Sequence, residues 1–130
     1  FSAAHRAITS RPMKVTAQSD RMGIRFDGSL PSLPATSLSR AVLPGTIQLP
    51  PDGKPILLLC DAQTIGGYPV LGKVIAADLP RAAQLRPGDT VCFSMTSLAE
   101  AHRLLRQQHN VLATVQQGIA QTHSLTEKAV

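Results

Sequence analysis

The sequence predicts a mainly β fold with a few helices, and three observations support this prediction. A hairpin signature occupies the middle of the chain, between Gly45 and Cys60. Two other segments, Met13 to Gln18 and Thr90 to Thr96, alternate apolar and polar residues, which is the period of a strand with one buried face. Helical periodicity is sustained over one long segment near the C-terminus. We therefore expect a sheet-rich body followed by a C-terminal helix.

Turn residues mark the central hairpin. The run Thr46 to Leu49 leads into the turn Pro50-Pro51-Asp52-Gly53, and the apolar run Pro55 to Cys60 follows it. Proline presets φ for a turn, Asp52 can accept a hydrogen bond from the backbone that follows it, and Gly53 tolerates a positive φ. We expect the two runs to pair as antiparallel strands.

A polar segment with two glycines follows the hairpin. It begins at Asp61 and ends at Gly66-Gly67-Tyr68-Pro69. Glycine lets the backbone approach a ligand closely, and loops at strand ends often carry binding residues. Asp61 could act as a base or position a water molecule. The residues equally allow Asp61 to do no more than cap a turn from Gln63 to Gly66.

A second polar segment surrounds Gly23, between the first two expected strands. It contains Asp20, Arg21 and Arg25. A guanidinium fork matches a carboxylate or a phosphate, so Arg21 or Arg25 is a candidate anion clamp. The alternative is a surface turn held by ion pairs along the chain. Together with the loop after the hairpin, this segment supplies donors that suit a ureido, lactam or carboxylate ligand.

The shorter elements follow from local patterns. Residues 1–12 form a leader with no sustained periodicity, and residues 29–39 form a loop rich in Pro and Ser. Residues 71–77 are expected as a strand, and Asp78 to Leu85 as a short helix that Asp78 caps.

One long helix is expected at residues 97–120, followed by a tail at residues 121–130. Ser97 and Glu100 form a capping box at its start. Apolar residues recur along it with helical spacing and form one stripe that faces the body of the protein or a partner. The stripe consists of Leu98, Ala101, Leu105, Leu112, Val115 and Ile119. The whole chain, residues 1–130, is expected to be a single domain.

Composition excludes several functional classes. The chain has 130 residues, a net charge of +5 and 3% aromatic residues. Its basic residues are scattered and bases would find hardly any aromatic platform, so no nucleic-acid partner is expected. The longest apolar run, Ile56 to Cys60, is far shorter than the ~20 residues that cross a bilayer. We therefore expect a soluble protein with no membrane partner.

Cysteine and histidine spacing predicts no metal site. Cys60 and Cys92 lie inside apolar runs and are expected to be buried, unpaired thiols in a cytoplasmic protein. No two histidines have the i, i+4 spacing of a zinc-binding pair. The phosphate-binding motif GxxxxGK(S/T) and the hydrolase motif GxSxG are absent as well.

Three segments resemble one family of proteins. They are SDRMGIR at residues 19–25, GTIQLPPDGKPILLLCDAQTIGGYP at residues 45–69 and ADLPRAAQLRPGDTVCF at residues 77–93. Through these segments the chain is similar to the allophanate hydrolase subunit 2 family. Members include the carboxyltransferase portion of urea carboxylase, the KipA-type antagonist of a sporulation kinase inhibitor, and the C subunit of ATP-dependent 5-oxoprolinase.

The resemblance implies a fold and a missing part. The fold is a cyclophilin-like β-barrel that occurs twice in a full-length member, and this chain matches the C-terminal half. The pattern of the first half is absent, and the chain begins with Phe1 rather than Met. We therefore expect a fragment whose missing N-terminal half supplies part of the site.

The resemblance also implies site residues. Asp61, Arg21 and Arg25 are expected to be catalytic. The residues expected to bind substrate are Asp20, Gln48, Gln63, Thr64, Gly66, Gly67 and Tyr68, and Gly23 and Pro69 match the family too. The chain departs from the family at Ile24 in place of Tyr, at Phe26 in place of Leu, and at Ile65 in place of a second Thr. The last change removes a hydroxyl donor beside the glycines.

Three functions are compatible with the resemblance. The first is the C-terminal part of a 5-oxoprolinase C subunit, which hydrolyses the cyclic amide 5-oxoproline with ATP and partner subunits. In it, Arg21 or Arg25 would neutralise developing charge and Asp61 would position water. The second is a biotin-dependent carboxyltransferase that acts on urea or a related amide, with biotin as its cofactor. The third is a KipA-like, non-catalytic regulatory module that binds a protein partner.

The resemblance implies partners as well. They are a subunit 1-type protein of the same family and either an oxoprolinase or a biotin carboxylase component. Because half of the family domain is missing, the isolated chain is expected to be inactive under each of the three functions.

Overall fold

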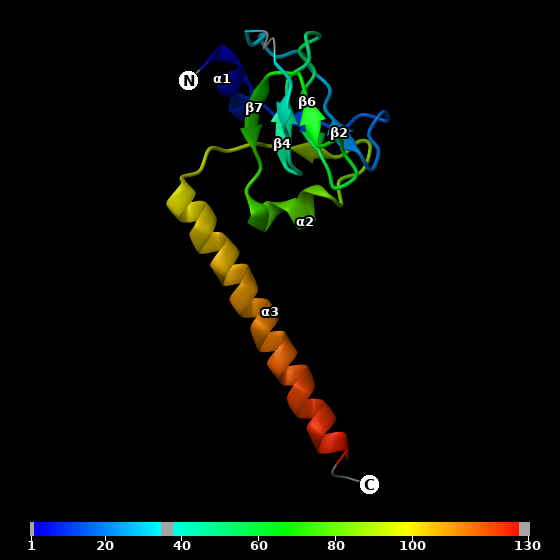
Figure 1. Ribbon diagram of the computed structural model, residues 1–130, viewed down its shortest axis with the longest axis vertical. Coiled ribbons are helices and arrows are strands. Elements are labelled where there is room, and N and C mark those ends of the chain that lie inside the picture. Colours follow the sequence, from blue (N-terminus) through cyan, green and yellow to red (C-terminus); the bar gives the residue numbers. More distant parts are fainter. Residues whose placement is uncertain (1, 35–37, 128–130) are drawn as a thin grey trace. The chain divides into compact units, whose positions relative to one another are not determined.

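The computed structural model describes residues 2–34 and 38–127, and side chains as far as residue 121. The chain divides into two compact units, Phe1–Met95 and Thr96–Val130. The first unit is mostly sheet with a few short helices, and the second is a single long helix (Figure 1). The mainly β class predicted from the sequence is confirmed for the first unit.

A four-stranded antiparallel sheet lies at the centre of the first unit. Gln48 pairs with Ile56 and Ile47 with Leu57, which confirms the predicted hairpin. In order across the sheet, the strands are β2 (Gly23–Arg25), β5 (Ile56–Leu58), β4 (Thr46–Gln48) and β7 (Val70–Lys73).

The hairpin turn is built as its residues predict. The N–H of Gly53 donates to the carbonyl of Pro50 at 3.0 Å, and the N–H of Lys54 donates to Asp52 Oδ1 at 3.1 Å. Gly53 has a φ of +73°, and a Cβ there would lie 2.6 Å from the carbonyl oxygen of Leu30. Both its backbone conformation and its neighbours therefore require glycine at this position.

Two small ribbons accompany the central sheet. One pairs β1 (Met13–Lys14) with β8 (Thr90–Val91), and the other pairs β3 (Arg40–Ala41) with β6 (Ile65–Gly66). The strands expected at residues 13–18, 71–77 and 90–96 are all shorter than predicted. Within residues 2–34 and 38–127 the three sheets do not close into a barrel, so the cyclophilin-like barrel is not confirmed.

Apolar side chains cover both faces of the central sheet. Leu57 belongs to the main hydrophobic core, whereas its neighbours Ile56 and Leu58 belong to a second cluster with Val42. Burial on both faces explains why this strand is a continuous apolar run instead of an alternating one. In the main core, Phe26 is fully buried and meets Phe93 edge to face.

The expected leader at residues 1–12 contains a helix, α1 (Ala3–Ser10). The backbone N–H of His5 donates to Ser2 Oγ at 3.4 Å, so Ser2 caps the helix. Ala4 and Ile8, one turn apart, are buried in the main core. Two buried apolar residues in a helix of 8 residues are too few to produce a recognisable helical periodicity of apolar residues in the sequence.

The predicted helix after residue 77 is split into η1 (Ala76–Asp78) and α2 (Leu79–Ala82). Asp78 makes no side-chain capping hydrogen bond, so the predicted cap is wrong. The reason is its backbone: Asp78 ends the preceding turn with helical φ and ψ, whereas a capping residue is usually extended.

The second unit consists of α3 (Leu98–Glu127), which continues seven residues past the expected end. Ser97 caps it as predicted, since the N–H of Glu100 donates to Ser97 Oγ at 3.1 Å. The carboxylate of Glu100 binds Arg103 at 2.7 Å instead of returning to the cap. None of the described helices is long and apolar enough to cross a membrane.

Both cysteines differ from expectation in their burial. Cys60 and Cys92 are free thiols, as predicted, but both are exposed. Cys60 lies beyond the end of β5, in the turn that follows it. Cys92 lies between the half-buried residues Val91 and Phe93, on the opposite side of the extended chain.

Candidate functional site

Two predicted catalytic residues meet where β2 begins and β5 ends. Arg21 Nε lies 3.4 Å from Asp61 Oδ2. The N–H of Leu59 donates to the carbonyl of Met22 at 3.0 Å, which holds the two segments together. The side chain of Asp61 is 44% exposed and that of Arg21 is 91% exposed. The pair is therefore open to solvent, where a substrate or water can reach either group.

Asp61 also contacts a thiol. Cys60 Sγ donates to Asp61 Oδ1 at 3.5 Å, so the two carboxylate oxygens face a thiol and a guanidinium. The apolar run before Asp61 predicts a core position for Cys60, which is why its place at the site was missed. The sequence signal for this contact is adjacency, since Cys60 directly precedes Asp61 in the chain.

Asp20 shapes the turn that leads into β2. Its Oδ1 accepts the N–H groups of Met22 at 2.9 Å and Gly23 at 3.1 Å. Gly23 then lets β2 and β5 approach, because a Cβ there would lie 3.1 Å from Leu57 O and from Ile56 Cγ2. These contacts position the neighbouring Arg21, while substrate binding by Asp20 remains a prediction.

Arg25 is held at the opposite end of β2. Ser19 Oγ accepts its backbone N–H at 2.9 Å and donates to its carbonyl at 3.3 Å. Arg25 pairs with Ile56, and Ile56 pairs in turn with Gln48. Paired residues point to the same face of a sheet, so Arg25 and Gln48 lie in one row with Ile56 between them.

Gln48 carries a buried donor without an acceptor. Its residue is 1% exposed, and no described atom accepts a hydrogen bond from its Nε2. Buried side-chain amides nearly always find a partner, and each exception requires an explanation. An amide nitrogen can satisfy the carbonyl oxygen of a ligand, which is the chemistry of a cyclic amide or of a ureido ring.

Gly66 forms the wall against which this amide lies. A Cβ on residue 66 would collide with Gln48 Nε2 and would also contact Val42 Cγ1 at 3.6 Å. The backbone of this segment is fixed by the strand pair of β3 and β6, beside which Val42 N–H donates to the carbonyl of Thr64 at 2.9 Å. Glycine at position 66 therefore makes room for the amide, a role more specific than general loop flexibility.

Residues on and beside β3 border the glycines and were not predicted as site residues. Arg40 pairs with Gly66, and a Cβ on Gly67 would lie 3.6 Å from Ser39 Oγ. The only sequence signal for them is a cation at the start of the short apolar run at residues 40–44.

The remaining predicted residues lie at the surface. The side chains of Gln63, Thr64 and Tyr68 are exposed, and Tyr68 is 46% exposed. The structure thus gathers the candidates into two groups, Arg21 with Asp61 and Arg25 with Gln48 and Gly66. The pairs Gly23–Leu58 and Ile24–Leu57 of β2 and β5 lie between the two groups. The assignment of individual residues to substrate contact remains a prediction.

Comparison with known proteins identifies the family. Residues 1–95 match the family described as "Carboxyltransferase domain, subdomain A and B". The chain belongs to this carboxyltransferase-domain family. The resemblance carried by the three sequence segments is therefore confirmed.

Two 5-oxoprolinase C subunits are among the relatives of this carboxyltransferase-type chain. The one from Haemophilus influenzae is 50% identical over 93 residues, which are 70% of this chain and 30% of the relative. The one from Escherichia coli is 39% identical over 110 residues, 82% of this chain and 35% of the relative. The chain thus spans about a third of the length of these curated relatives.

A solved structure supports the same family. The crystal structure of the K. lactis urea amidolyase superposes with a TM-score of 0.74 and 27% identity. The match covers 81% of this chain and 7% of that protein. The chain corresponds to one small part of a much larger polypeptide in this case as well.

Proposed function

We propose that this chain is the C-terminal part of a 5-oxoprolinase C subunit, which opens the cyclic amide 5-oxoproline by ATP-dependent hydrolysis together with partner subunits. The observation that carries the proposal is the 50% identity to the 5-oxoprolinase C subunit of Haemophilus influenzae, against 27% to urea amidolyases. The matched segment of 93 residues is long enough to hold both candidate groups, which lie between residues 21 and 66.

The donor set fits such a substrate. The buried Nε2 of Gln48 can donate to the ring carbonyl, a group that accepts hydrogen bonds. Arg25, in the same row of the sheet, is placed to neutralise negative charge that develops on the ring or on a carboxylate. Asp61 is open to solvent and can hold a water molecule, while Arg21 keeps its carboxylate in place.

Completion of the site belongs to the proposal. The cyclophilin-like barrel implied by the resemblance is part of the proposal, and the N-terminal half of the family domain, which carries the other copy of the fold, would supply the other wall of the site. ATP would bind on a partner, which is an oxoprolinase component or a subunit 1-type protein. The two free thiols fit a reducing cytoplasm.

The full complex tests the proposal. The complete protein that contains these residues is combined with its partner subunits, and glutamate formation from 5-oxoproline is measured with and without ATP. We expect ATP-dependent turnover that falls by about a hundredfold or more in the Asp61→Asn variant. Unchanged turnover in that variant would remove Asp61 from the mechanism, and the absence of turnover in the wild-type complex would contradict the proposal.

A second candidate is a biotin-dependent carboxyltransferase, because the ureido carbonyl of biotin also suits the Gln48 donor. The structural match to the K. lactis urea amidolyase favours it. When bound, biotin would carry the carboxyl group, and Gln48 and Arg25 would orient its ring. Stimulation by free biotin, or a biotinylated protein that copurifies, supports this candidate over the first.

A further inference from the structure

The register of the ribbon formed by β3 and β6 places Arg40 on the face that is directed toward Gln48. Arg40 pairs with Gly66 across the ribbon, and residues paired in this way direct their side chains to the same face. A Cβ on Gly66 would point at the amide of Gln48, because it would collide with Nε2. The side chain of Arg40 therefore leaves β3 on the face of the ribbon that meets the buried amide.

Val42 gives independent evidence for this orientation. It follows Arg40 by two residues, so the two side chains lie on one face of an extended chain. Val42 is 4% exposed and belongs to the cluster with Ile56 and Leu58 of the central sheet. Its N–H donates to the carbonyl of Thr64 at 2.9 Å, which continues the ribbon beyond its registered pairs. The face that carries Val42 thus packs on the central sheet, and Arg40 stands at the exposed end of this face.

Arg40 is a cation that no described carboxylate neutralises. The ion pairs among the residues whose side chains are described join Arg21 with Asp61 and Arg103 with Glu100. Arg40 is exposed and takes part in neither of them. A guanidinium presents a planar fork of donors that matches a carboxylate with two parallel hydrogen bonds. Arg40 is therefore able to bind a carboxylate supplied by a ligand.

Arg25 is the other cation beside Gln48, and a buried side chain separates the two. Ile56 stands between Arg25 and Gln48 in the row across the sheet and is 9% exposed. The residue opposite Arg40 is Gly66, which has no side chain to stand between the guanidinium and the amide. Arg40 is thus better placed than Arg25 to share a small ligand with Gln48, and Arg25 remains available for charge that develops during the reaction.

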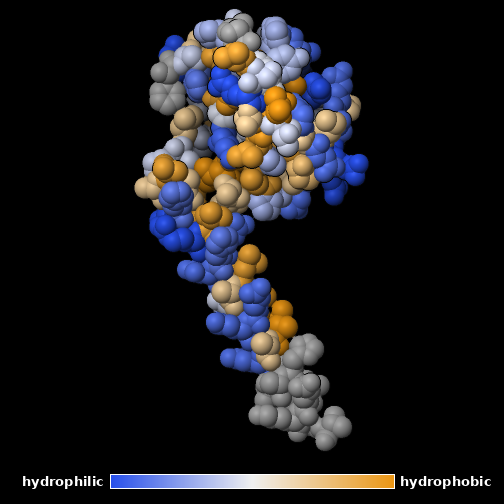
Figure 2. Space-filling view, viewed as in Figure 1, coloured by the Kyte–Doolittle hydropathy of each residue, from blue (hydrophilic) through white to orange (hydrophobic). Residues whose placement is uncertain are grey.

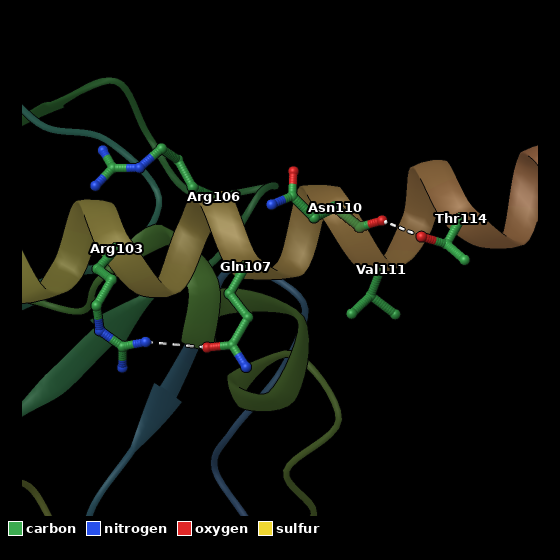
Figure 3. Close-up of a pocket in the computed structure, with 6 residues that line it drawn as sticks. All are labelled: Arg103, Arg106, Gln107, Asn110, Val111 and Thr114. Atoms are coloured by element: carbon green, nitrogen blue, oxygen red, sulfur yellow. Dashed lines mark hydrogen bonds between the residues drawn. The ribbon is translucent and has the colours of Figure 1, made fainter.

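Polar surface by itself does not mark an anion site, because hydrophilic residues are spread over both units of the chain (Figure 2). A hollow on α3 contains two arginines as well. Figure 3 shows that Arg103 donates to Gln107 Oε1 at 3.2 Å and that Arg106 extends away from the helix. Arg103 also binds Glu100 at 2.7 Å, which neutralises its charge. All six residues that line this hollow belong to α3, outside the residues 1–95 that match the family.

We propose that Arg40 binds the carboxylate of the substrate while Gln48 donates to the ring carbonyl. The ligand class is a small cyclic amide that carries a carboxylate. In 5-oxoproline the carbonyl carbon and the carbon that bears the carboxylate are both bonded to the ring nitrogen, so one edge of the ring presents both groups. Urea offers a carbonyl without a carboxylate and would leave Arg40 unused. Arg40 is thus a specificity-determining residue, an inference that rests on the proposed function.

In the proposed complex the ligand takes the place of Gly66 beside the amide. The Nε2 of Gln48 is closed off from solvent, and the backbone of Gly66 lies against it. Two registered residue pairs join β3 and β6, and a two-stranded ribbon is at best marginally stable on its own. A small displacement of β6 therefore opens the donor at low cost. Arg40 is paired with Gly66 and borders the space that this displacement opens.

Two lactams with the same ring test the assignment. γ-Butyrolactam is 5-oxoproline without the carboxylate. The complete protein that contains these residues is assembled with its partner subunits and titrated with each lactam by calorimetry in the absence of ATP. We expect the wild type to bind 5-oxoproline about tenfold or more tightly than γ-butyrolactam, because the bidentate, charge-assisted contact adds to the contact with the amide.

Arg40→Gln should abolish this difference by weakening the binding of 5-oxoproline alone. Unchanged affinity for γ-butyrolactam would show that the variant is folded and that its amide donor is intact. Arg40→Lys should recover part of the difference, because lysine keeps the charge but not the planar fork. Arg81→Gln is the matched control, since Arg81 is an exposed arginine on α2, outside both candidate groups. It is expected to leave both affinities unchanged.

Equal losses of affinity for the two lactams in Arg40→Gln would overturn the assignment, and so would a wild-type complex that binds both equally. ATP-dependent turnover of 5-oxoproline by the same complex separates the two proposals. If the wild type hydrolyses 5-oxoproline and Arg40→Gln binds it normally, the assignment of Arg40 is wrong and the proposed function stands. A complex that binds 5-oxoproline through Arg40 and does not hydrolyse it contradicts the proposed function alone. A wild-type complex that binds neither lactam overturns both.

Discussion

The side-chain amide nitrogen of Gln48 lies against Gly66, where a Cβ on residue 66 would collide with it. Gln48 belongs to β4 of the central sheet and Gly66 to β6 of a separate ribbon, so the contact joins two sheets. The backbone of Gly66 lies on one side of the amide. The side chain of Val42 lies near the same point, because a Cβ on residue 66 would also contact Val42 Cγ1. Residues of two different sheets thus pack directly against each other.

Gly66→Ala is expected to lower the free energy of unfolding by about 1–3 kcal/mol, because the added methyl group must displace a buried side chain. Urea unfolding of the isolated chain measures the loss. Gly67→Ala is the control, since its Cβ would meet Ser39 Oγ at an ordinary contact distance of 3.6 Å. Equal losses in the two variants would show that Gln48 is not the reason for glycine at position 66.

Gln48→Met removes the unsatisfied donor and keeps the volume of the side chain. We expect the free energy of unfolding to stay the same or to rise, because an unpaired buried amide costs stability. Turnover of the full complex should fall by about tenfold or more, since the donor to the ligand is lost. Gln18→Met, at an exposed position, controls for loss of an amide. A strongly destabilised Gln48→Met chain would mean that the amide has a partner in the free protein.

Arg21 and Asp61 are expected to contribute little to folding. Their side chains are 91% and 44% exposed, and ion pairs open to water stabilise by no more than about 1 kcal/mol. A double-mutant cycle with Arg21→Ala and Asp61→Asn, followed by urea unfolding, measures the coupling. A coupling free energy of several kcal/mol would mean that the pair stabilises the fold, and it would weaken the assignment of Arg21 and Asp61 to catalysis.

Gly53→Ala is expected to lower the free energy of unfolding by about 1–3 kcal/mol, from the left-handed backbone and the close approach to the carbonyl of Leu30. Thermal and urea unfolding measure it. Gly72→Ala provides the comparison, because a Cβ there would meet nothing within 4 Å. If both substitutions cost the same, the hairpin turn does not depend on the conformation of Gly53.

The start of α3 should respond to acid. The hydrogen bond from Arg103 lowers the pKa of Glu100 below its usual range. A lowered pKa in the folded state means that the stabilisation is present above the usual pKa of Glu and is lost as the pH falls through the lowered value. NMR titration of Glu100 measures this, and Arg103→Gln should return the pKa of Glu100 toward its usual range. Identical titrations with and without Arg103 would contradict the assigned cause.

Local sequence determined the hairpin, the capped start of α3 and the family. Proline, Asp52 and Gly53 specify a turn within a few residues, and Ser97 captures an N–H three residues away. These interactions are short in sequence, so the residue types alone predict them. The family motifs are also contiguous, which is why a part of the family domain suffices to carry them.

Tertiary structure alone decided which residues meet. Ala4 and Ile8 became core residues because a distant sheet covers them, and Cys60 became exposed because β5 ends before it. The pairing of Arg21 with Asp61 and the row from Arg25 to Gln48 join segments that are far apart in the chain. Strand register sets such contacts, and register depends on the packing of whole faces, which no single segment of sequence contains.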